Sequence, residues 1–509
     1  MYSDLYIGPL VGSTSTNQVT VRIKGKMDVN LEDLVLIVSR NNYKYLGVVI
    51  KIFEDNPLLS SRLPDIPRDI GSVYAMSYMN AVVSLLGIIR EKVFEPMIPI
   101  PPSTGSPVYR VNKKLLENLN IINSPIYIGF HKFSGWSVPL NPDAVNYHIA
   151  IVGRTGCGKS HAVRILIDEL VRIGRKVIVF DHSGRDYVPF FRDKYMVISD
   201  REIIPNISSI ASIITSALGV YQDSYSRDYI EIATYLYSIS GGDIGEAEKL
   251  LKSISSLSFK SFKKNIIEKT IPFQEIIEEL EKVASKINLN KIIWDNHRFY
   301  QILASTINIM GGRGTTMIKM VLKLIKSAFI EGRLNLNRFS NRKYTAEKIA
   351  EILLNEDTKC IVLDVSNETI EVRRGIVSDI LDRLWFEIEE KLKEINVAVV
   401  IDEAQNYASD TSFPSKYLIA RTAREGRKWR FGLILASQRW ISDLDTEVRS
   451  NIGSIIMGPL QTMNDLKEIS GIINIYDINP NIMGRGDFYI AGLLNPFNRP
   501  ILIHTFPGK

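Results

Sequence analysis

Residues 153 to 160 constrain this chain more than any other stretch. They read Gly-Arg-Thr-Gly-Cys-Gly-Lys-Ser and match the phosphate-binding loop pattern G-x-x-x-x-G-K-[ST] in full. The run Tyr147–Val152 before the loop is mostly apolar and predicts a buried strand, and apolar residues recur at helical spacing from Ser160 to Arg172. Because a chance match would lack this strand and helix, the sequence predicts a nucleoside triphosphate site.

The residue types of this loop suit phosphate chemistry. Its glycines let backbone N–H groups close around phosphate oxygens, and the N-terminus of the following helix adds its positive end. Lys159 is expected to reach the β- and γ-phosphates, and Ser160 to ligate Mg²⁺. ATP and Mg²⁺ are therefore the expected cofactors. The residues expected to bind the nucleotide here are Gly153, Arg154, Thr155, Gly156, Cys157, Gly158, Lys159, Ser160 and His161.

A second apolar run, Val397–Ile401, ends in two carboxylates, Asp402 and Glu403. At the carboxyl end of a buried strand, Asp402 would hold the Mg²⁺ shell and Glu403 would activate the attacking water. Asp364 is a competing candidate because it also ends an apolar run. It is followed by Val365 and so lacks the base, and we therefore interpret it as a strand-end residue.

Two further strand ends carry polar side chains. Gln438 follows the apolar run Phe431–Ala436, and its amide could sense the γ-phosphate or the water beside it. The alternative is a glutamine that only closes the strand in a loop. Asp181 ends the strand after the phosphate-loop helix and could join the nucleotide site from the adjacent strand.

Arginines recur every three residues at positions 421, 424, 427 and 430, with Lys428 among them. At 3.6 residues per turn they spiral around a helix instead of sharing one face. They form a solvated basic helix, or one of them is an arginine finger that meets the γ-phosphate of a neighbouring subunit.

Composition excludes several other classes of protein. The two cysteines, Cys157 and Cys360, argue against a disulfide framework or a cysteine-based metal site, and the six histidines show no ligand spacing. The chain shows neither a signal peptide nor an apolar run long enough to cross a membrane, so a cytoplasmic protein without membrane contact is expected. The net charge of +6 is compatible with nucleic acid, or with an ordinary lysine-rich surface.

The order of patterns predicts four segments. Residues 1–110 read as a small N-terminal β-barrel followed by a Pro-rich connector, and residues 111–204 as the first part of an ATPase core. Residues 205–345 are almost wholly helical in pattern and predict an inserted subdomain. Residues 346–509 complete the core with the acidic pair and Gln438. The predicted fold class is α/β with a mostly parallel sheet, because strands and helices alternate on both sides of the insertion.

These motifs together resemble the HerA helicase-translocases of archaea, in the FtsK–HerA branch of RecA-like motors. The resemblance rests on five stretches in order: His148–Ser160, Asp181–Gly184, Val400–Asn406, Ala423–Lys428 and Leu435–Arg439. One departure is that Arg185-Asp186-Tyr187 stands where the family usually has Glu-Tyr, which indicates a divergent paralogue. The resemblance implies a RecA-like P-loop core, and a HAS-barrel domain at the N-terminus.

The resemblance also implies how such a chain works. Family members are homohexamers with an ATP site at each subunit boundary and double-stranded DNA in the central channel. They commonly act with the nuclease NurA in DNA end resection. By motif position, Lys159 and Ser160 would be the phosphate-loop residues, and Asp402 and Glu403 the acidic pair. Gln438 would be the sensor, and Arg427, or else Arg424, the finger acting in trans.

The resulting hypothesis is an ATP-hydrolysing DNA helicase or translocase that works with a NurA-like nuclease in DNA repair. Three alternatives stay open: a HerA-like ATPase coupled to another effector in defence, a secretion or conjugation ATPase, and a nucleotide-dependent scaffold that does not move DNA. An intact acidic pair favours turnover, but it does not couple turnover to motion.

Overall fold

The computed structural model describes residues 5–25, 28–40, 43–56, 77–90, 93–111, 113–117, 126–220, 223–262, 273–310, 315–355, 357–472 and 478–507. Contacts divide the chain into two compact units. One comprises residues 1–175 and 432–509, and the other comprises residues 176–431. Within the described ranges, no helix is both long and apolar enough to cross a membrane.

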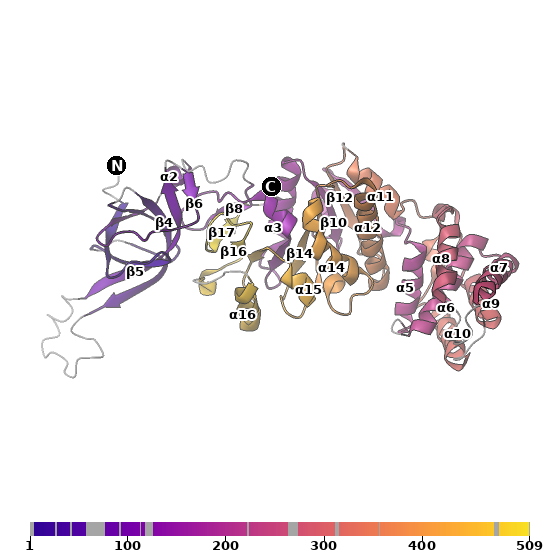
Figure 1. Ribbon diagram of the computed structural model, residues 1–509. Helices are drawn as coiled ribbons and strands as arrows, with labels where there is room; N and C mark the ends of the chain where they lie inside the picture. The colour runs from indigo at the N-terminus through magenta and orange to yellow at the C-terminus, as the bar shows by residue number, and fades with distance from the viewer. Residues whose placement is uncertain are drawn as a thin grey trace, which may run out of the picture. The chain divides into compact units, whose positions relative to one another are not determined.

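The first unit begins with a closed antiparallel barrel (Figure 1). Its strands follow the order β2-β1-β7-β3-β4-β5, and β2 also pairs with β5, which closes the barrel. The short strand β6 extends the sheet beside β5. Buried residues such as Val21, Val35, Tyr45 and Val83 fill the barrel. The strands are β1 (Tyr6–Val11), β2 (Gln18–Arg22), β3 (Leu34–Val38), β4 (Lys44–Asp55), β5 (Tyr78–Arg90), β6 (Val93–Glu95) and β7 (Pro107–Arg110).

The predicted N-terminal barrel is confirmed, and the apolar runs near residues 19–23, 34–38 and 45–53 form its strands β2, β3 and β4. The 13-residue strand β5, which pairs with both β4 and β2, has no strand pattern that could be recognised from the sequence. It is buried along most of its length, so its residues lack the alternation of apolar and polar side chains that marks a half-buried strand.

The rest of the first unit is α/β. Strands β14, β9 and β15 lie parallel and side by side, and β16, β17 and β8 continue the sheet in antiparallel pairs. Figure 1 shows α3 beside this part of the sheet. The elements are α2 (Lys113–Glu117), β8 (Gly129–His131), β9 (Ile149–Val152), α3 (Lys159–Arg172), β14 (Phe431–Ser437), α15 (Thr446–Ser450), β15 (Ser454–Met457), α16 (Met463–Ile472), β16 (Asp487–Gly492) and β17 (Ile501–Thr505).

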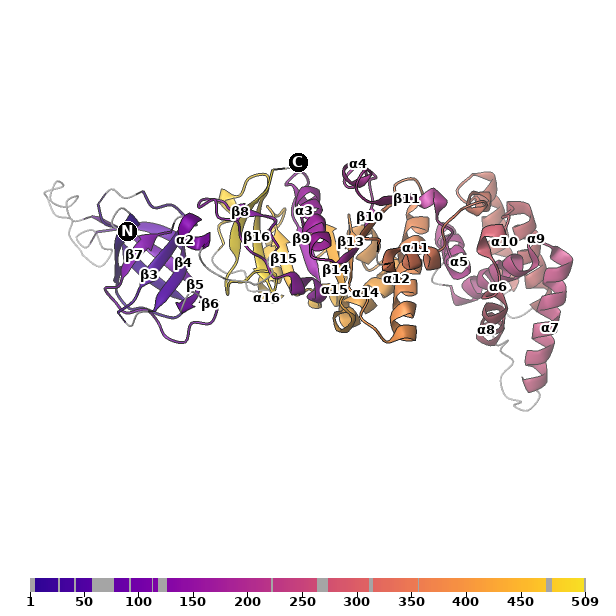
Figure 2. The same ribbon diagram turned by 90° about the horizontal axis from the view of Figure 1, so that it is seen from above.

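The second unit contains four parallel strands in the order β11-β12-β10-β13. Their register places Asp181 opposite Asp364 and Phe180 opposite Ile401, so the carboxyl ends of β10, β12 and β13 lie together. Helices α11 and α12 lie alongside these strands (Figure 2). The elements are β10 (Lys176–Asp181), α4 (Val188–Phe191), β11 (Met196–Ser199), α11 (Ala346–Leu354), β12 (Cys360–Asp364), α12 (Ile370–Lys391), β13 (Val397–Ile401), α13 (Gln405–Ala408) and α14 (Ser415–Glu425).

A helical subdomain interrupts the second unit between β11 and α11. Helix α6 packs against α5, α8 and α9, and the rings of Tyr237 and Trp294 stack with centroids 4.7 Å apart. The helical pattern of this insertion is confirmed, for example by α8 and α10. The bounds are α5 (Ile207–Ala217), α6 (Ser224–Ser240), α7 (Ile244–Phe262), α8 (Phe273–Ala284), α9 (Asn296–Met310) and α10 (Thr315–Ile330).

The predicted fold class is therefore confirmed: an N-terminal antiparallel barrel, an α/β part whose strands are mostly parallel, and a helical insertion. The domain limits predicted at residues 110, 204 and 345 stay predictions. Contacts group the phosphate loop with the barrel and the C-terminal strands, and they group the acidic pair with the helical insertion.

Candidate functional site

The phosphate loop lies in the first unit between the fully buried strand β9 and the start of α3 at Lys159. Two of its glycines adopt left-handed backbone conformations, Gly156 with φ of 79° and Gly158 with φ of 107°. Residues that carry a side chain rarely adopt these φ values, which accounts for glycine at both positions. The tip of the loop, from Arg154 to Gly156, is exposed to solvent. This arrangement leaves backbone N–H groups at a helix N-terminus open to an anion.

Lys159 folds back across this loop. Its Nζ donates a hydrogen bond to the backbone oxygen of Gly153 at 2.7 Å and approaches the oxygen of Arg154 at 3.4 Å. The ammonium group is thus held over the backbone that would cradle a phosphate group. Gln438 also reaches the loop, because β14 is parallel to β9 and places Ser437 opposite Val152.

The Oγ1 of Thr155 donates to the Oε1 of Gln438 at 3.0 Å. The structure therefore brings together two predicted residues that are 283 positions apart. The amide of Gln438 is placed against the exposed tip of the loop, where it can respond to a group bound there.

Backbone groups from the C-terminal part of the chain hold the phosphate loop and the start of α3 through hydrogen bonds. The backbone N–H of Gly486 donates to the oxygen of Cys157 at 2.8 Å, and the N–H of Arg154 donates to the oxygen of Pro459 at 2.8 Å. The ring of His161 contacts the backbone oxygen of Phe506 at 2.6 Å through Nε2. Pro459 and Gly486 could not be predicted from the sequence, since they contact the loop through backbone groups that every residue type carries.

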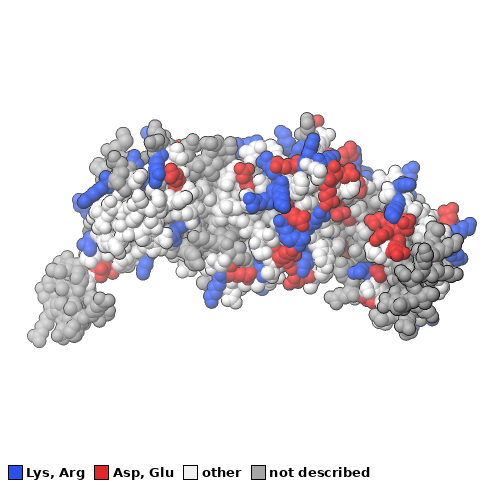
Figure 3. Space-filling view, viewed as in Figure 1, with Lys and Arg blue, Asp and Glu red and all other residues white. Residues whose placement is uncertain are grey.

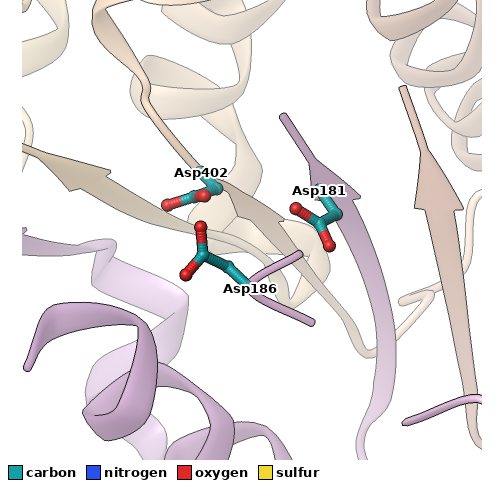
Figure 4. A group of neighbouring side chains, drawn as sticks. All are labelled: Asp181, Asp186 and Asp402. Atoms are coloured by element: carbon teal, nitrogen blue, oxygen red, sulfur yellow. The ribbon is translucent and has the colours of Figure 1, made fainter. Parts of the chain in front are cut away.

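The acidic residues lie in the second unit. Asp181, Asp186 and Asp402 each offer a carboxylate oxygen, and these oxygens lie within 4.8 Å of one another. Figure 4 shows the three carboxylates turned toward one another at the ends of their strands and the following loop. Asp402 is only 4% exposed, and its burial together with the nearby carboxylates of Glu403, Asp186 and Asp181 raises its pKa to about 8.

This donor set fits a hard divalent cation. It contains only carboxylate oxygens, the ligands that Mg²⁺ prefers, and a cation would favour the ionised form of buried Asp402. Asp402 and Asp186 are the two carboxylates best suited to hold Mg²⁺, because the oxygens of Asp181 are engaged elsewhere. Asp186 was not among the predicted metal ligands.

The carboxylate of Asp181 organises the loop that follows it. Its Oδ1 accepts from the backbone of Ser183 at 3.2 Å and of Gly184 at 3.0 Å. Its Oδ2 accepts from the backbone of Tyr187 at 2.9 Å and of Val188 at 3.0 Å, at the start of α4. These bonds shape the loop that carries Asp186 and leave Asp181 few lone pairs for a ligand.

Glu403 lies directly after Asp402 in an uncommon backbone conformation, with φ of 46°. Its side-chain Oε2 accepts a hydrogen bond from Nε2 of Gln405. Left-handed backbone at a residue other than glycine costs about 1–3 kcal/mol and concentrates at functional sites. Asp364, the competing candidate, accepts from the backbone and hydroxyl of Ser366 at 3.0 and 2.6 Å and so has a local bonding role.

The predicted finger arginines differ in their surroundings. Arg421 pairs with Glu389, and its guanidinium lies 4.3 Å from the centroid of the Trp385 ring, so it is used within its own unit. Arg424 and Arg427 are exposed, at the end of α14 and in the turn after it. Exposure is what a residue that acts on a neighbouring subunit requires.

A buried strand, a glycine-rich loop and a helix that begins at the loop lysine define a P-loop nucleotide-binding protein. The family model described as "Helicase HerA, central domain" matches residues 126–384. The chain belongs to the HerA helicase family, as the sequence motifs predicted.

Known relatives agree with this assignment, and a solved structure shares the fold. The DNA double-strand break repair helicase HerA of Sulfurisphaera tokodaii is 26% identical over 481 residues, which cover 91% of this chain and 85% of the relative. The protein of the same name from Sulfolobus acidocaldarius is 26% identical over 475 residues, with the same coverage. The structure of VirB4 of Thermoanaerobacter pseudethanolicus aligns with a TM-score of 0.51 at 16% identity, covering 76% of this chain and 97% of that one. This last likeness concerns the fold alone.

Proposed function

We propose that this chain is an ATP-driven translocase of double-stranded DNA that works as a homohexameric ring. The observation that carries the proposal is the match to the central domain of the HerA helicases together with an intact phosphate loop and an intact acidic pair. The loop lysine, the strand-end aspartate and the adjacent glutamate are the residue types that phosphoryl transfer to water requires.

Each residue has a distinct role in this proposal. Lys159 neutralises charge on the β- and γ-phosphates. Ser160 and Asp402, the latter with Asp186 beside it, would hold Mg²⁺, which would supply positive charge to the transferring phosphoryl group. Glu403 accepts a proton from the attacking water. Gln438 senses the γ-phosphate from the tip of the loop, where Thr155 already contacts its amide.

We propose that the arginine finger acts in trans, with Arg427 as the first candidate and Arg424 as the second. Both side chains are exposed, whereas Arg421 is held by Glu389 and Trp385. A finger that completes a neighbour's site couples hydrolysis to ring assembly, because the isolated subunit then lacks one catalytic charge.

DNA is the proposed substrate of the motor, and a NurA-like nuclease its proposed partner in end resection. Relatives over 91% of the chain are named DNA double-strand break repair helicases, which supports this class of substrate. On the face shown in Figure 3, basic and acidic side chains intermix over α11, α12 and α14. The ion pairs Lys348–Glu351, Arg383–Glu387 and Arg421–Glu389 lie on these helices, so this region offers little net positive charge to a DNA backbone.

The test is the ATPase rate of the purified protein with and without linear duplex DNA, with Glu403→Gln as the inactive control. Strong stimulation by duplex DNA is expected. A rate that DNA leaves unchanged would favour a secretion ATPase or a nucleotide-dependent scaffold. Stimulation together with co-purification of a non-nuclease effector would keep the motor but replace the proposed partner.

A further inference from the structure

Two consecutive arginines near the start of α12, Arg373 and Arg374, have no part in the roles described so far. They are the fourth and fifth residues of a helix that begins at Ile370. Positive charge close to a helix N-terminus is unfavourable, because that end of the helix is itself positive. Both side chains are partly buried, and the guanidinium of Arg374 has its pKa lowered by that burial. Their contacts show what offsets this cost.

Arg373 bridges the loops that follow two strands of the acidic site. Its Nε donates to the backbone oxygen of Glu368 at 2.7 Å, and its Nη2 donates to the oxygen of Ser366 at 2.7 Å. Both acceptors belong to the loop after β12. Its Nη1 donates to the oxygen of His182 at 3.2 Å, in the loop after β10. One guanidinium therefore joins three carbonyl groups in two loops, which the fixed fork of its donors permits and a lysine ammonium does not.

Arg374 holds the third loop. Its Nε donates to the backbone oxygen of Asn406 at 2.7 Å, after β13. Asn406 in turn donates two hydrogen bonds to the backbone oxygen of Glu403. Its backbone N–H donates at 2.9 Å and its side-chain Nδ2 at 3.2 Å. Glu403 is the residue with left-handed backbone. The chain of contacts from Arg374 through Asn406 thus ends on the strained peptide that carries the proposed base.

The loops after β10 and β13 are also joined to each other. Nδ1 of His182 and the hydroxyl of Tyr407 lie 2.9 Å apart, and the two rings meet edge to face. Together with the bonds from Arg373 and Arg374, this contact connects the segments after β10, β12 and β13 to one another and to α12. Hydrogen bonds from a charged donor are among the stronger ones in proteins, and together these contacts can offset the backbone strain at Glu403.

We propose that Arg373 and Arg374 are positioning residues for Glu403, which hold the three loops of the acidic site to α12 and keep the base carboxylate in its working orientation. This inference rests on the proposed ATPase function. Neither arginine is expected to contact the nucleotide, so their loss should slow hydrolysis without weakening binding.

The test uses steady-state ATPase assays and the binding of a fluorescent ATP analogue by the full-length protein. Arg373→Gln and Arg374→Gln should each lower kcat at least tenfold, while the Kd of the analogue stays within twofold of the wild type. Arg374→Lys should recover most of the rate, because one donor suffices for one carbonyl. Arg373→Lys should not recover the rate, because the side chain at position 373 must donate to three carbonyl oxygens. Arg383→Gln is the matched control, since Arg383 lies on the same helix and pairs only with Glu387 among the ion pairs of the described residues.

A double-mutant cycle separates positioning from general destabilisation. If Arg373 acts through Glu403, adding Arg373→Gln to Glu403→Gln should cost no further factor in the slow residual single-turnover rate that the Glu403→Gln protein retains without its base. A further tenfold loss, or equal losses in kcat and in nucleotide affinity, would overturn the inference. Wild-type rates in both Gln variants would overturn it as well. A wild-type protein that does not hydrolyse ATP would instead overturn the proposed function.

Discussion

Replacing Glu32 with Gln should change how the stability of the first unit depends on pH. Glu32 lies in the turn before β3, is 2% exposed, and accepts a hydrogen bond from the hydroxyl of Tyr489 on β16 at 2.8 Å. Burial raises its pKa from 4.5 to about 7, and the bond from Tyr489 only partly opposes this effect. Gln keeps an oxygen that can accept the same bond, so the substitution removes the titration and little else.

The direction of this pH dependence follows from the pH range over which the folded and unfolded states hold different numbers of protons. Between pH 4.5 and 7 the folded protein keeps a proton on Glu32 that the unfolded chain releases, so the contribution of this group is full below pH 4.5 and is lost as pH rises through 7. The two pKa values differ by about 2.5, and each unit corresponds to about 1.4 kcal/mol. The Glu32→Gln protein should therefore gain about 3 kcal/mol relative to the wild type between pH 4.5 and pH 8.

Differential scanning calorimetry at half-unit steps from pH 4.5 to 8 measures this difference. For a unit of this size, about 3 kcal/mol corresponds to a relative rise in Tm of roughly 6–12 °C, most of which should develop between pH 4.5 and 7. Glu54→Gln on β4 is the control, because Glu54 is an exposed residue of the same barrel. Parallel curves of Tm against pH for Glu32→Gln and the wild type would refute the reasoning, since Glu32 would then titrate alike in the folded and unfolded states.

The remaining predictions concern the motor. Lys159→Ala should abolish ATP turnover, and Glu403→Gln should keep ATP binding but stop hydrolysis; a near-normal rate in the second variant would return Asp364 to consideration. Affinity for duplex DNA should fall steeply as salt rises and should not depend on sequence, and a salt-insensitive or strongly sequence-selective interaction in a fluorescence titration would contradict this. Arg427→Ala should bind ATP almost normally and hydrolyse it roughly 10³-fold more slowly. Mixed rings of Arg427→Ala and Lys159→Ala subunits should regain some activity; if such rings form without that gain, the same experiment on Arg424 follows.

The parts of the site that could be predicted from the sequence are those with short local patterns. The phosphate loop is contiguous, and each of its positions is explained by phosphate geometry. Asp402 follows a run of five apolar residues, so its place at the end of a buried strand could be inferred without any partner. The structure then places Asp402 beside Asp186, a neighbour that lies far away in the sequence.

What could not be predicted depends on long-range contacts. Arg373 lies some thirty positions before Glu403, and it acts through backbone oxygens that any residue type carries. Asp181 was expected in the nucleotide site because it ends a strand, yet its oxygens accept four backbone N–H groups of its own loop. A pattern shows that a carboxylate stands at a strand end, but the donors that turn toward it emerge only from the folded loop.

Helix α12 connects the loops of the acidic site to helix α5 of the helical insertion, within the second unit. Its first turns hold the acidic loops through Arg373 and Arg374, and the next turns pack on α5 of the helical insertion. A Cβ on Gly375 would lie 3.3 Å from Ile213, and Asp379 accepts the backbone N–H of Asn206 at 2.7 Å, at the start of α5. Because α12 packs directly on α5, a displacement of α12 at the acidic loops would act on the start of the insertion.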